Sequence, residues 1–184
     1  MSLQRALASI DTIYDAGAGG ASWAAVGSSL AKLVKARSAS LMLREPGAAR
    51  FKVLGHPNIP EEAVADYLAN FRQHDLWTQR AAAQVGRPGG VPRIWSSGSL
   101  VPEAEFLRSE FWNRFGRHHG LRYVIGTVVP LGRPATCRWG CNGRPGRSPL
   151  RARTSGCWRR CCRICAARCN CATGSPPSPA PPRR

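Results

Sequence analysis

The chain has 184 residues, enough for one domain of ordinary size with a buried core. It holds 27 Lys/Arg against 10 Asp/Glu, a formal net charge of +17, and it has no apolar run long enough to span a membrane as a helix. The first residues, Met1 to Arg5, lack the basic region and apolar block of a signal peptide, so the expected location is the cytoplasm.

The order of helical and strand periodicity predicts an α+β domain. Expected helices cover, in chain order, residues 3–14, 23–34, 60–74 and 102–115, and expected strands cover residues 38–43, 51–54, 91–95 and 121–129. Ser22 is placed to cap the second helix, and Pro60 with Glu61 suits the start of the third. Residues 80–90 are weakly patterned, so we expect a loop there.

The stretch from Phe106 to Pro130 forms the middle of this domain. Its first half carries an aromatic stripe at helical spacing, and Gly116 and Gly120 then break the pattern. An apolar, β-rich run follows from Leu121. A helix that leads into a buried strand is typical of an α+β domain.

Composition changes abruptly near Gly132. Residues 1–132 hold 15 Lys/Arg and all 10 Asp/Glu, net +5, whereas residues 133–184 hold 12 Arg and no acid, net +12. All 8 cysteines also lie after residue 132. Natural domains rarely divide their composition in this way. We therefore expect one domain over residues 1–131 and a disordered, low-complexity basic tail over residues 132–184.

Short motifs follow one another in a recognisable order before this change. They are Ile13-Tyr14-Asp15-Ala16 ahead of Trp23, Ala36-Arg37-Ser38-Ala39-Ser40-Leu41, Tyr67 with Phe71 and Asp75-Leu76-Trp77, Leu100-Val101-Pro102, Ser109-Glu110-Phe111-Trp112-Asn113, and His119-Gly120-Leu121-Arg122-Tyr123. The succession resembles the amino-terminal sensory half of bacterial LuxR-type helix-turn-helix transcription regulators. It rests on order and spacing over about residues 3–131, and Leu76 departs from the proline that such proteins often have after the aspartate.

The resemblance implies a GAF/PAS-type domain, an antiparallel sheet with helices on it, ahead of a short carboxy-terminal DNA-binding domain. Its partner would be a small-molecule ligand of unknown identity, and DNA would be contacted only through that second domain. No helix-turn-helix pattern occurs within the 184 residues. A homodimer is left open, and no cofactor, membrane partner or catalytic constellation is expected, so the chain is not predicted to be an enzyme.

Aromatic residues and one carboxylate are the candidates for the ligand site. They are Tyr67, Phe71, Asp75, Trp77, Trp95, Trp112 and Tyr123. Trp77 and Trp95 lie in less regular segments, which favours a place in a pocket. The alternative is that most of these aromatics are ordinary core residues. Asp75 could anchor a polar ligand group or cap a helix.

The tail lacks the strand, the long helix and the helix-turn-helix that the resemblance implies should follow. Its Cys and Trp residues recur at helical spacing from Cys157 to Cys169. Cys and Trp codons both begin with TG, so reading one base earlier turns each into a codon for Leu, Met or Val. We hypothesise that a one-base shift near Gly132 replaced the authentic continuation, and we expect the next strand and the closing helix to be missing.

Two further interpretations of the tail stay open. Cys162 and Cys165 have zinc-ligand spacing, and Cys157 and Cys169 could complete four thiolates, although no metal site is our main expectation. The tail arginines could bind nucleic acid nonspecifically through its phosphates. The alternative function is therefore a small basic protein with a zinc- or RNA-binding tail.

Overall fold

A computed structural model describes residues 3–44, 51–85, 93–130 and 136–143. The strands are β1 (Ser38–Arg44), β2 (Phe51–Gly55), β3 (Arg93–Ser96), β4 (Val124–Pro130) and β5 (Thr136–Asn142). The α-helices are α1 (Leu3–Gly17), α2 (Trp23–Leu33), α3 (Glu61–Asp66), α4 (Leu76–Val85), α5 (Ser97–Leu100) and α6 (Glu103–Arg108). Two π-helical turns, η1 (Tyr67–Phe71) and η3 (Trp112–Gly116), and a 3-10 turn, η2 (Arg72–His74), complete the set.

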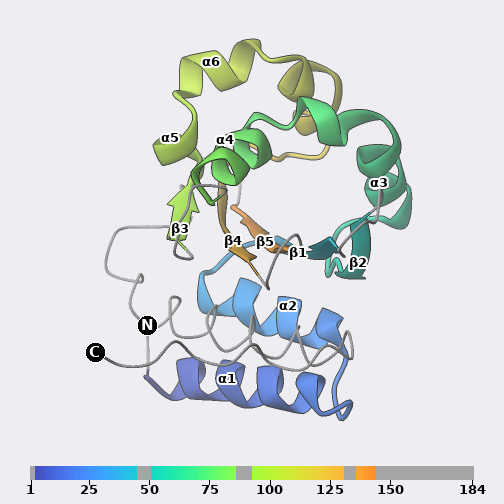
Figure 1. Ribbon diagram of the computed structural model, residues 1–184, viewed down its shortest axis with the longest axis vertical. Coiled ribbons are helices and arrows are strands. Elements are labelled where there is room, and N and C mark those ends of the chain that lie inside the picture. The colour runs from blue at the N-terminus through green and yellow to red at the C-terminus, as the bar shows by residue number, and fades with distance from the viewer. Residues whose placement is uncertain (1–2, 45–50, 86–92, 131–135, 144–184) are drawn as a thin grey trace.

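The five strands form one antiparallel sheet in the order β2-β1-β5-β4-β3. Helices α1 and α2 lie on one face of the sheet, and α3 to α6 lie on the other (Figure 1). The predicted α+β class, with an antiparallel sheet flanked by helices, is confirmed.

Strand β5 lies at the centre of the sheet, between β1 and β4. Its register runs from Ser38 opposite Asn142 to Arg44 opposite Thr136 on one side, and β4 pairs along its other side. The expectation that the strand after β4 is missing is therefore wrong. Each residue of β5 other than proline brings a backbone N–H and C=O to the ladders on its two edges, so a strand without a clear apolar pattern can still pair on both sides. The sheet thus extends past the boundary expected at residue 131.

The face covered by α1 and α2, here called the aliphatic face, is a core of mainly aliphatic side chains. Ser22 caps α2 as predicted, its side chain accepting a hydrogen bond from the Ala25 amide at 3.1 Å. The apolar side of α2 packs on the strands, and α1 packs on α2 (Figure 1). The buried residues of this core include Ile13, Val26, Leu30, Leu33, Ala39, Leu41, Leu43, Ile125 and Cys141.

The opposite face, here called the cavity face, carries most of the buried aromatic side chains. Its core consists of Met42, Tyr67, Phe71, Trp77, Val101, Phe106, Phe111 and Phe115. Successive side chains along each strand point to opposite faces of the sheet, so neighbouring residues belong to different cores. Leu41 lies in the aliphatic core, for example, and its neighbour Met42 lies in the aromatic core.

In three predicted segments, the helices of the structure have different bounds from those expected. Residues 80–85, expected in a loop, belong to α4, because Asp75 caps that helix and three consecutive alanines favour it without giving a periodic stripe. The helix expected over residues 102–115 divides at Ser109, whose hydroxyl accepts a hydrogen bond from the Trp112 amide at 3.1 Å and restarts the helix. The third helix begins at Glu61, one residue after Pro60.

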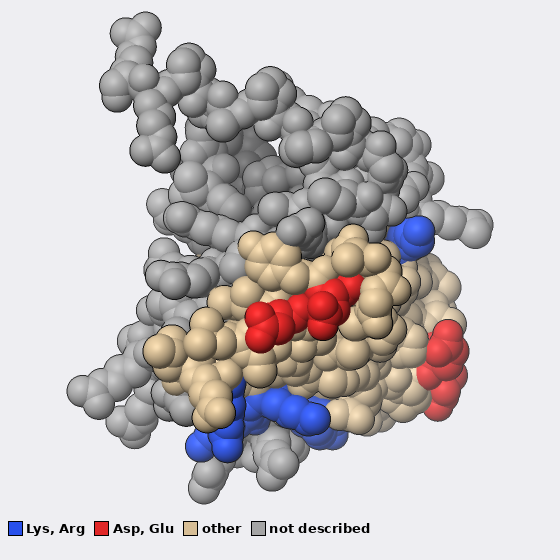
Figure 2. Space-filling model, turned by 90° about the horizontal axis from the view of Figure 1, so that it is seen from below, with Lys and Arg blue, Asp and Glu red and all other residues tan. Residues whose placement is uncertain are grey.

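Charged groups are scattered over the face that Figure 2 shows. Uncharged residues make up most of the described surface in this view, and the Lys/Arg and Asp/Glu side chains form small separate groups. The described part of this face therefore offers no continuous basic surface to a nucleic acid. Within the ranges that the structure describes, every helix is too short or too polar to cross a bilayer.

Candidate functional site

A cavity of about 120 Å³ lies on the cavity face, between the sheet and the helices above it. Alternate residues of the central strands form its floor: Ser40 and Met42 from β1, and Arg138, Gly140 and Asn142 from β5. The helices contribute the walls, and most of the wall side chains are apolar or aromatic. They include Ala63, Val64, Tyr67, Trp77, Ala81, Phe111 and Phe115.

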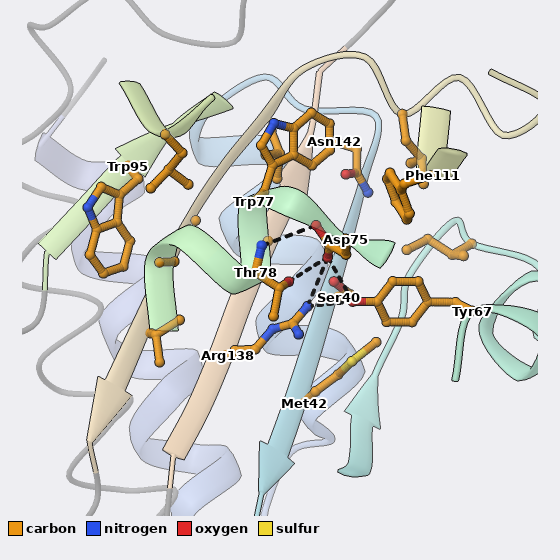
Figure 3. Close-up of a pocket in the computed structure, with 18 of the residues that line it drawn as sticks. Ser40, Met42, Tyr67, Asp75, Trp77, Thr78, Trp95, Phe111, Arg138 and Asn142 are labelled. Atoms are coloured by element: carbon orange, nitrogen blue, oxygen red, sulfur yellow. Dashed lines mark hydrogen bonds and ion pairs between the residues drawn. The ribbon is translucent and has the colours of Figure 1, made fainter. Parts of the chain in front are cut away.

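Asp75 is the centre of a polar cluster in this cavity, defined here as Asp75, Tyr67, Thr78 and Arg138 (Figure 3). The carboxylate is buried and accepts hydrogen bonds from the Tyr67 hydroxyl at 2.8 Å and from the Thr78 hydroxyl at 2.5 Å. The Thr78 amide also donates to it, at 3.1 Å, so Asp75 caps α4 as well. The helix cap predicted for Asp75 is thus confirmed, whereas its role as an anchor for a ligand group stays a prediction.

Arg138 joins the cluster from β5. Its Nη2 donates to the Tyr67 hydroxyl at 2.9 Å and lies 3.6 Å from Asp75 Oδ2. Burial lowers the pKa of Arg138, but the attraction of Tyr67 and Asp75 outweighs this and leaves the pKa above its usual value. Arg138 is therefore a charged group in the cavity floor, with its side chain 16% exposed.

Tyr67 is the neutral member that connects Asp75 with Arg138. Burial raises the pKa of its hydroxyl to about 12, although the nearby Arg138 charge acts in the opposite direction. At neutral pH the hydroxyl therefore keeps its proton, donates to Asp75 and accepts from Arg138.

Two buried N–H groups in the cavity lining are unpaired among the described residues. Within the described ranges, Trp77 Nε1 and Arg138 Nη1 have no hydrogen-bond partner. The other indole of the lining differs, because Trp95 Nε1 donates to Gln84 Oε1 at 3.1 Å. Buried donors are nearly always paired in folded proteins, so these two positions call for an acceptor.

An aromatic wall borders the polar cluster. Trp77 stacks on Phe106 with ring centroids 4.1 Å apart, and Phe71 stacks on Phe115 at 5.0 Å. Tyr67 meets Phe111 edge-on at 6.3 Å. Stacked and edge-on pairs each add stabilisation beyond the area they bury, so this wall is a firm surface for an apolar ligand.

The cavity brings together four of the seven predicted site residues: Tyr67, Asp75, Trp77 and Trp95. The other three lie outside its lining. Phe71 is buried behind Phe115, and Trp112 packs against Phe106 with centroids 5.5 Å apart. Tyr123 donates to the Glu103 carboxylate at 3.3 Å. A ligand-binding role for the seven stays a prediction.

Several lining residues were missed by sequence reasoning. Arg138 and Asn142 lie in the segment treated as a tail, where one arginine among twelve carries no distinguishing signal. Ser40 and Met42 were placed on a strand, but their face was not assigned. Thr78 could have been found from the sequence, because it follows the possible helix cap Asp75 by three residues. At that spacing a side-chain hydroxyl can donate a hydrogen bond to the carboxylate of the cap.

Metal ligands are not gathered in the described ranges, where no group of three His, Cys, Asp or Glu side chains could hold an ion. Cys141 is a free thiol in the aliphatic core, and burial raises its pKa. The alternative zinc ligands Cys157, Cys162, Cys165 and Cys169 lie outside the described residues.

Comparison with known proteins places the fold. No family model matches the sequence, and no curated protein matches it either. Among solved structures, the VqsR ligand-binding domain from Pseudomonas aeruginosa superposes with a TM-score of 0.64 at 14% identity, covering 91% of this chain and 94% of that one. The chain has the fold of a LuxR-type ligand-binding domain.

Two other structures agree. CepR2 from Burkholderia cenocepacia, described as an N-acylhomoserine lactone dependent LuxR-family transcription factor, gives a TM-score of 0.58 at 19% identity over 89% of this chain and 93% of that one. SdiA of Escherichia coli, in complex with octanoyl-rac-glycerol, gives 0.53 at 21% identity over 83% of this chain and 59% of that one. Identities this low establish a shared fold.

Proposed function

We propose that this chain is the signal-sensing part of a LuxR-family transcription regulator in the cytoplasm. A small molecule binds in the cavity and shifts the equilibrium between states that differ in competence for DNA binding. DNA contact itself belongs to a helix-turn-helix domain, for which the 184 residues contain no pattern. The observation that carries the proposal is the cavity with its buried Asp75 cluster, on a fold shared with ligand-binding regulators.

The arrangement suits binding better than catalysis. The Asp75 carboxylate is held by Tyr67 and by two groups of Thr78, so its lone pairs are engaged in holding the cluster. The cavity lining within the described ranges includes serine and threonine hydroxyls, but it has no histidine or lysine to act on them as a general base. The cluster therefore positions a ligand's polar group against an aromatic wall.

Thermal denaturation with candidate ligands tests the proposal. N-acylhomoserine lactones and 1-octanoylglycerol are suitable neutral probes, because solved neighbours are described with such molecules. A ligand at a hundred times its Kd stabilises a protein by about 3 kcal/mol, which raises the Tm by several degrees. If neither these probes nor small acids shift the Tm, the sensing function is contradicted.

Two matched glycine variants show whether a bound probe occupies the cavity. Gly140 lines it, and a Cβ there would meet Ser40 and Val124 at ordinary contact distance, so Gly140→Val adds bulk to the cavity floor. Gly98 is exposed with no atom near its Cβ position, so Gly98→Val is the control. We expect Gly140→Val to lose the ligand-induced shift and Gly98→Val to keep it.

We also propose that residues following Gly132 are translated out of frame. Cys137, Trp139 and Cys141 occupy alternate positions of β5, and reading one base earlier gives Leu, Met or Val at each of them. The same alternate positions are thus apolar in both frames, which is compatible with a central strand. Sequencing the gene and finding peptides across residues 130–170 from an unbroken frame would remove this idea.

The zinc- or RNA-binding alternative makes a different prediction. A tail that evolved as a metal site would hold about one zinc per purified chain through its four thiolates. The ligand-sensing proposal expects none, so metal analysis of the purified protein separates the two.

A further inference from the structure

The cavity contains a buried cation that is only partly compensated. Arg138 Nη2 is used by the neutral Tyr67 hydroxyl, and its separation from the Asp75 carboxylate, 3.6 Å, exceeds hydrogen-bond length. Arg138 Nη1 is buried and, in the described part of the chain, has no partner. Asp75 thus balances the Arg138 charge through Nη2 without a direct hydrogen bond, and Nη1 is the part of the guanidinium that still lacks an acceptor, which an added anion could supply.

Asp75 has little capacity left for a ligand. Its two oxygens accept three hydrogen bonds, from Tyr67, the Thr78 amide and the Thr78 hydroxyl, and Arg138 approaches one of them. A carboxylate offers about four acceptor sites. Oδ2 accepts two of these bonds and is approached by Arg138, so only one acceptor position, on Oδ1, remains for an N–H or O–H group of a ligand. Any further donor would be buried unpaired, which is unfavourable.

Trp77, like Arg138, has a buried N–H group that lacks an acceptor among the described residues. Its side chain is 7% exposed, it lines the cavity, and its Nε1 has no acceptor among the described residues. Both buried polar atoms left unpaired in the described ranges are thus donors. The polar end of a fitting ligand should present acceptor oxygens rather than donors.

The cavity also limits the size of the apolar part. Its volume of about 120 Å³ is somewhat below the roughly 150 Å³ of an engineered protein cavity that binds benzene. Tyr67, Trp77, Phe111 and Phe115 surround it with ring faces and edges. Because the cavity is partly open to solvent, one aromatic ring can enter it with one end toward the opening, and a larger apolar body would exceed its closed part.

We propose that the cavity binds a small apolar carboxylate, of the size of a single-ring aromatic acid, whose anion accepts a hydrogen bond from Arg138 Nη1. The Trp77 N–H is then available to a second acceptor oxygen of the ligand. This inference rests on the proposed sensing function and specifies the ligand class of the same site. The proposed ligand class differs from signalling molecules that carry an amide N–H or a hydroxyl group.

The test measures Kd by calorimetry for four probes of similar size against the full chain: benzoate, methyl benzoate, benzamide and toluene. Acetate is added as a fifth probe, because it reports nonspecific attraction to the arginines of residues 133–184. Benzoate is expected to bind at least about tenfold tighter than every other probe, since it alone combines a charge-assisted hydrogen bond with a ring. Equal or tighter binding of methyl benzoate or benzamide overturns the proposal.

Two arginine variants locate the anion. Arg138 and Arg72 both lie over the Phe51 ring, at 5.6 Å and 5.1 Å, but only Arg138 lines the cavity. Arg138→Met is expected to bring benzoate down to the affinity of methyl benzoate, and Arg72→Met, which removes the same charge, is expected to leave the preference intact. Retention of the preference in Arg138→Met, or its loss in Arg72→Met, contradicts the assignment.

If Arg138→Met does not fold, the affinities of the five probes for the unaltered chain still decide whether the acid is preferred.

The outcomes also distinguish failure of the acid preference from failure of the sensing function. Binding of neutral lactones or of octanoylglycerol without benzoate binding refutes the acid preference and leaves the sensing function standing. Failure of all small molecules to bind refutes both.

Discussion

The two faces of one sheet differ in how completely they are packed. On the aliphatic face, α1 and α2 cover the strands with branched side chains, and Ile13, Val26 and Leu30 are fully buried. On the cavity face, β5 carries the charge of Arg138, and an unfilled space lies between the sheet and the helices. Two N–H groups there, one on β5 and one on α4, are unpaired within the described ranges. One side of the sheet is a packed core, and the other leaves the space in which we propose that a ligand binds.

The cost of the second arrangement can be estimated. At about 24 cal/mol per Å³ of closed cavity, a space of about 120 Å³ forgoes at most roughly 3 kcal/mol of packing, and its opening to solvent lowers this value. That is a large share of the stability of a typical domain. A ligand that fills the space and pairs Trp77 and Arg138 recovers part of it, so ligand binding and folding stability should rise together.

The largest expected effect comes from the charged cluster. Asp75→Asn leaves Arg138 buried without an anion and should lower the free energy of unfolding by about 3–5 kcal/mol in urea denaturation. The double variant Asp75→Asn with Arg138→Met, which removes both charges, should be more stable than Asp75→Asn alone. A loss below about 1 kcal/mol for the single variant would mean that the cluster is not a buried ion pair.

The second-largest loss of stability is expected when a side chain of the aliphatic core is truncated. Leu30 in α2 is fully buried, and Leu30→Ala is expected to cost about 3 kcal/mol through lost transfer energy and a new cavity. Leu7 in α1 is 49% exposed, so Leu7→Ala should stay within about 0.5 kcal/mol. Similar losses for the two variants would show that this face is not the packed one.

A matched pair of valines compares the faces directly. Val26 lies in the aliphatic core and Val64 lines the cavity. Val26→Ala should cost about 2 kcal/mol, whereas Val64→Ala, which only widens an existing space, should cost about 1 kcal/mol or less. Chemical denaturation of both variants measures the difference, and the reverse order would refute the contrast.

The smallest effect is expected at alkaline pH. Since the pKa of Tyr67 is raised to about 12, its contribution to stability is complete below pH 10, the ordinary pKa, and declines as pH rises toward 12. At pH 11 the stability advantage of the wild type over Tyr67→Phe should therefore be smaller by about 1 kcal/mol than at pH 8. A constant difference across this range would show that Tyr67 ionises normally.

Sequence patterns predicted most local structure on both faces. The stripe in α1, the Ser22 cap and the β-rich runs before and after Pro46-Gly47 each depend on residues close in sequence. Alternation and helical spacing report such neighbours directly. The aromatic candidates were also visible, and four of the seven line the cavity, although no pattern separated them from Phe71, Trp112 and Tyr123, which pack elsewhere.

The amino-acid order by itself determined the helices, most strands, the α+β class and the aromatic character of one side of the sheet. Only the tertiary structure decided that Thr136–Asn142 enters the centre of the sheet, and that Arg138 thereby meets Asp75 and Tyr67. Those partners lie far apart in the chain, and an unusual composition concealed the strand. Pairing between distant strands depends on backbone hydrogen bonds that leave little trace in local periodicity.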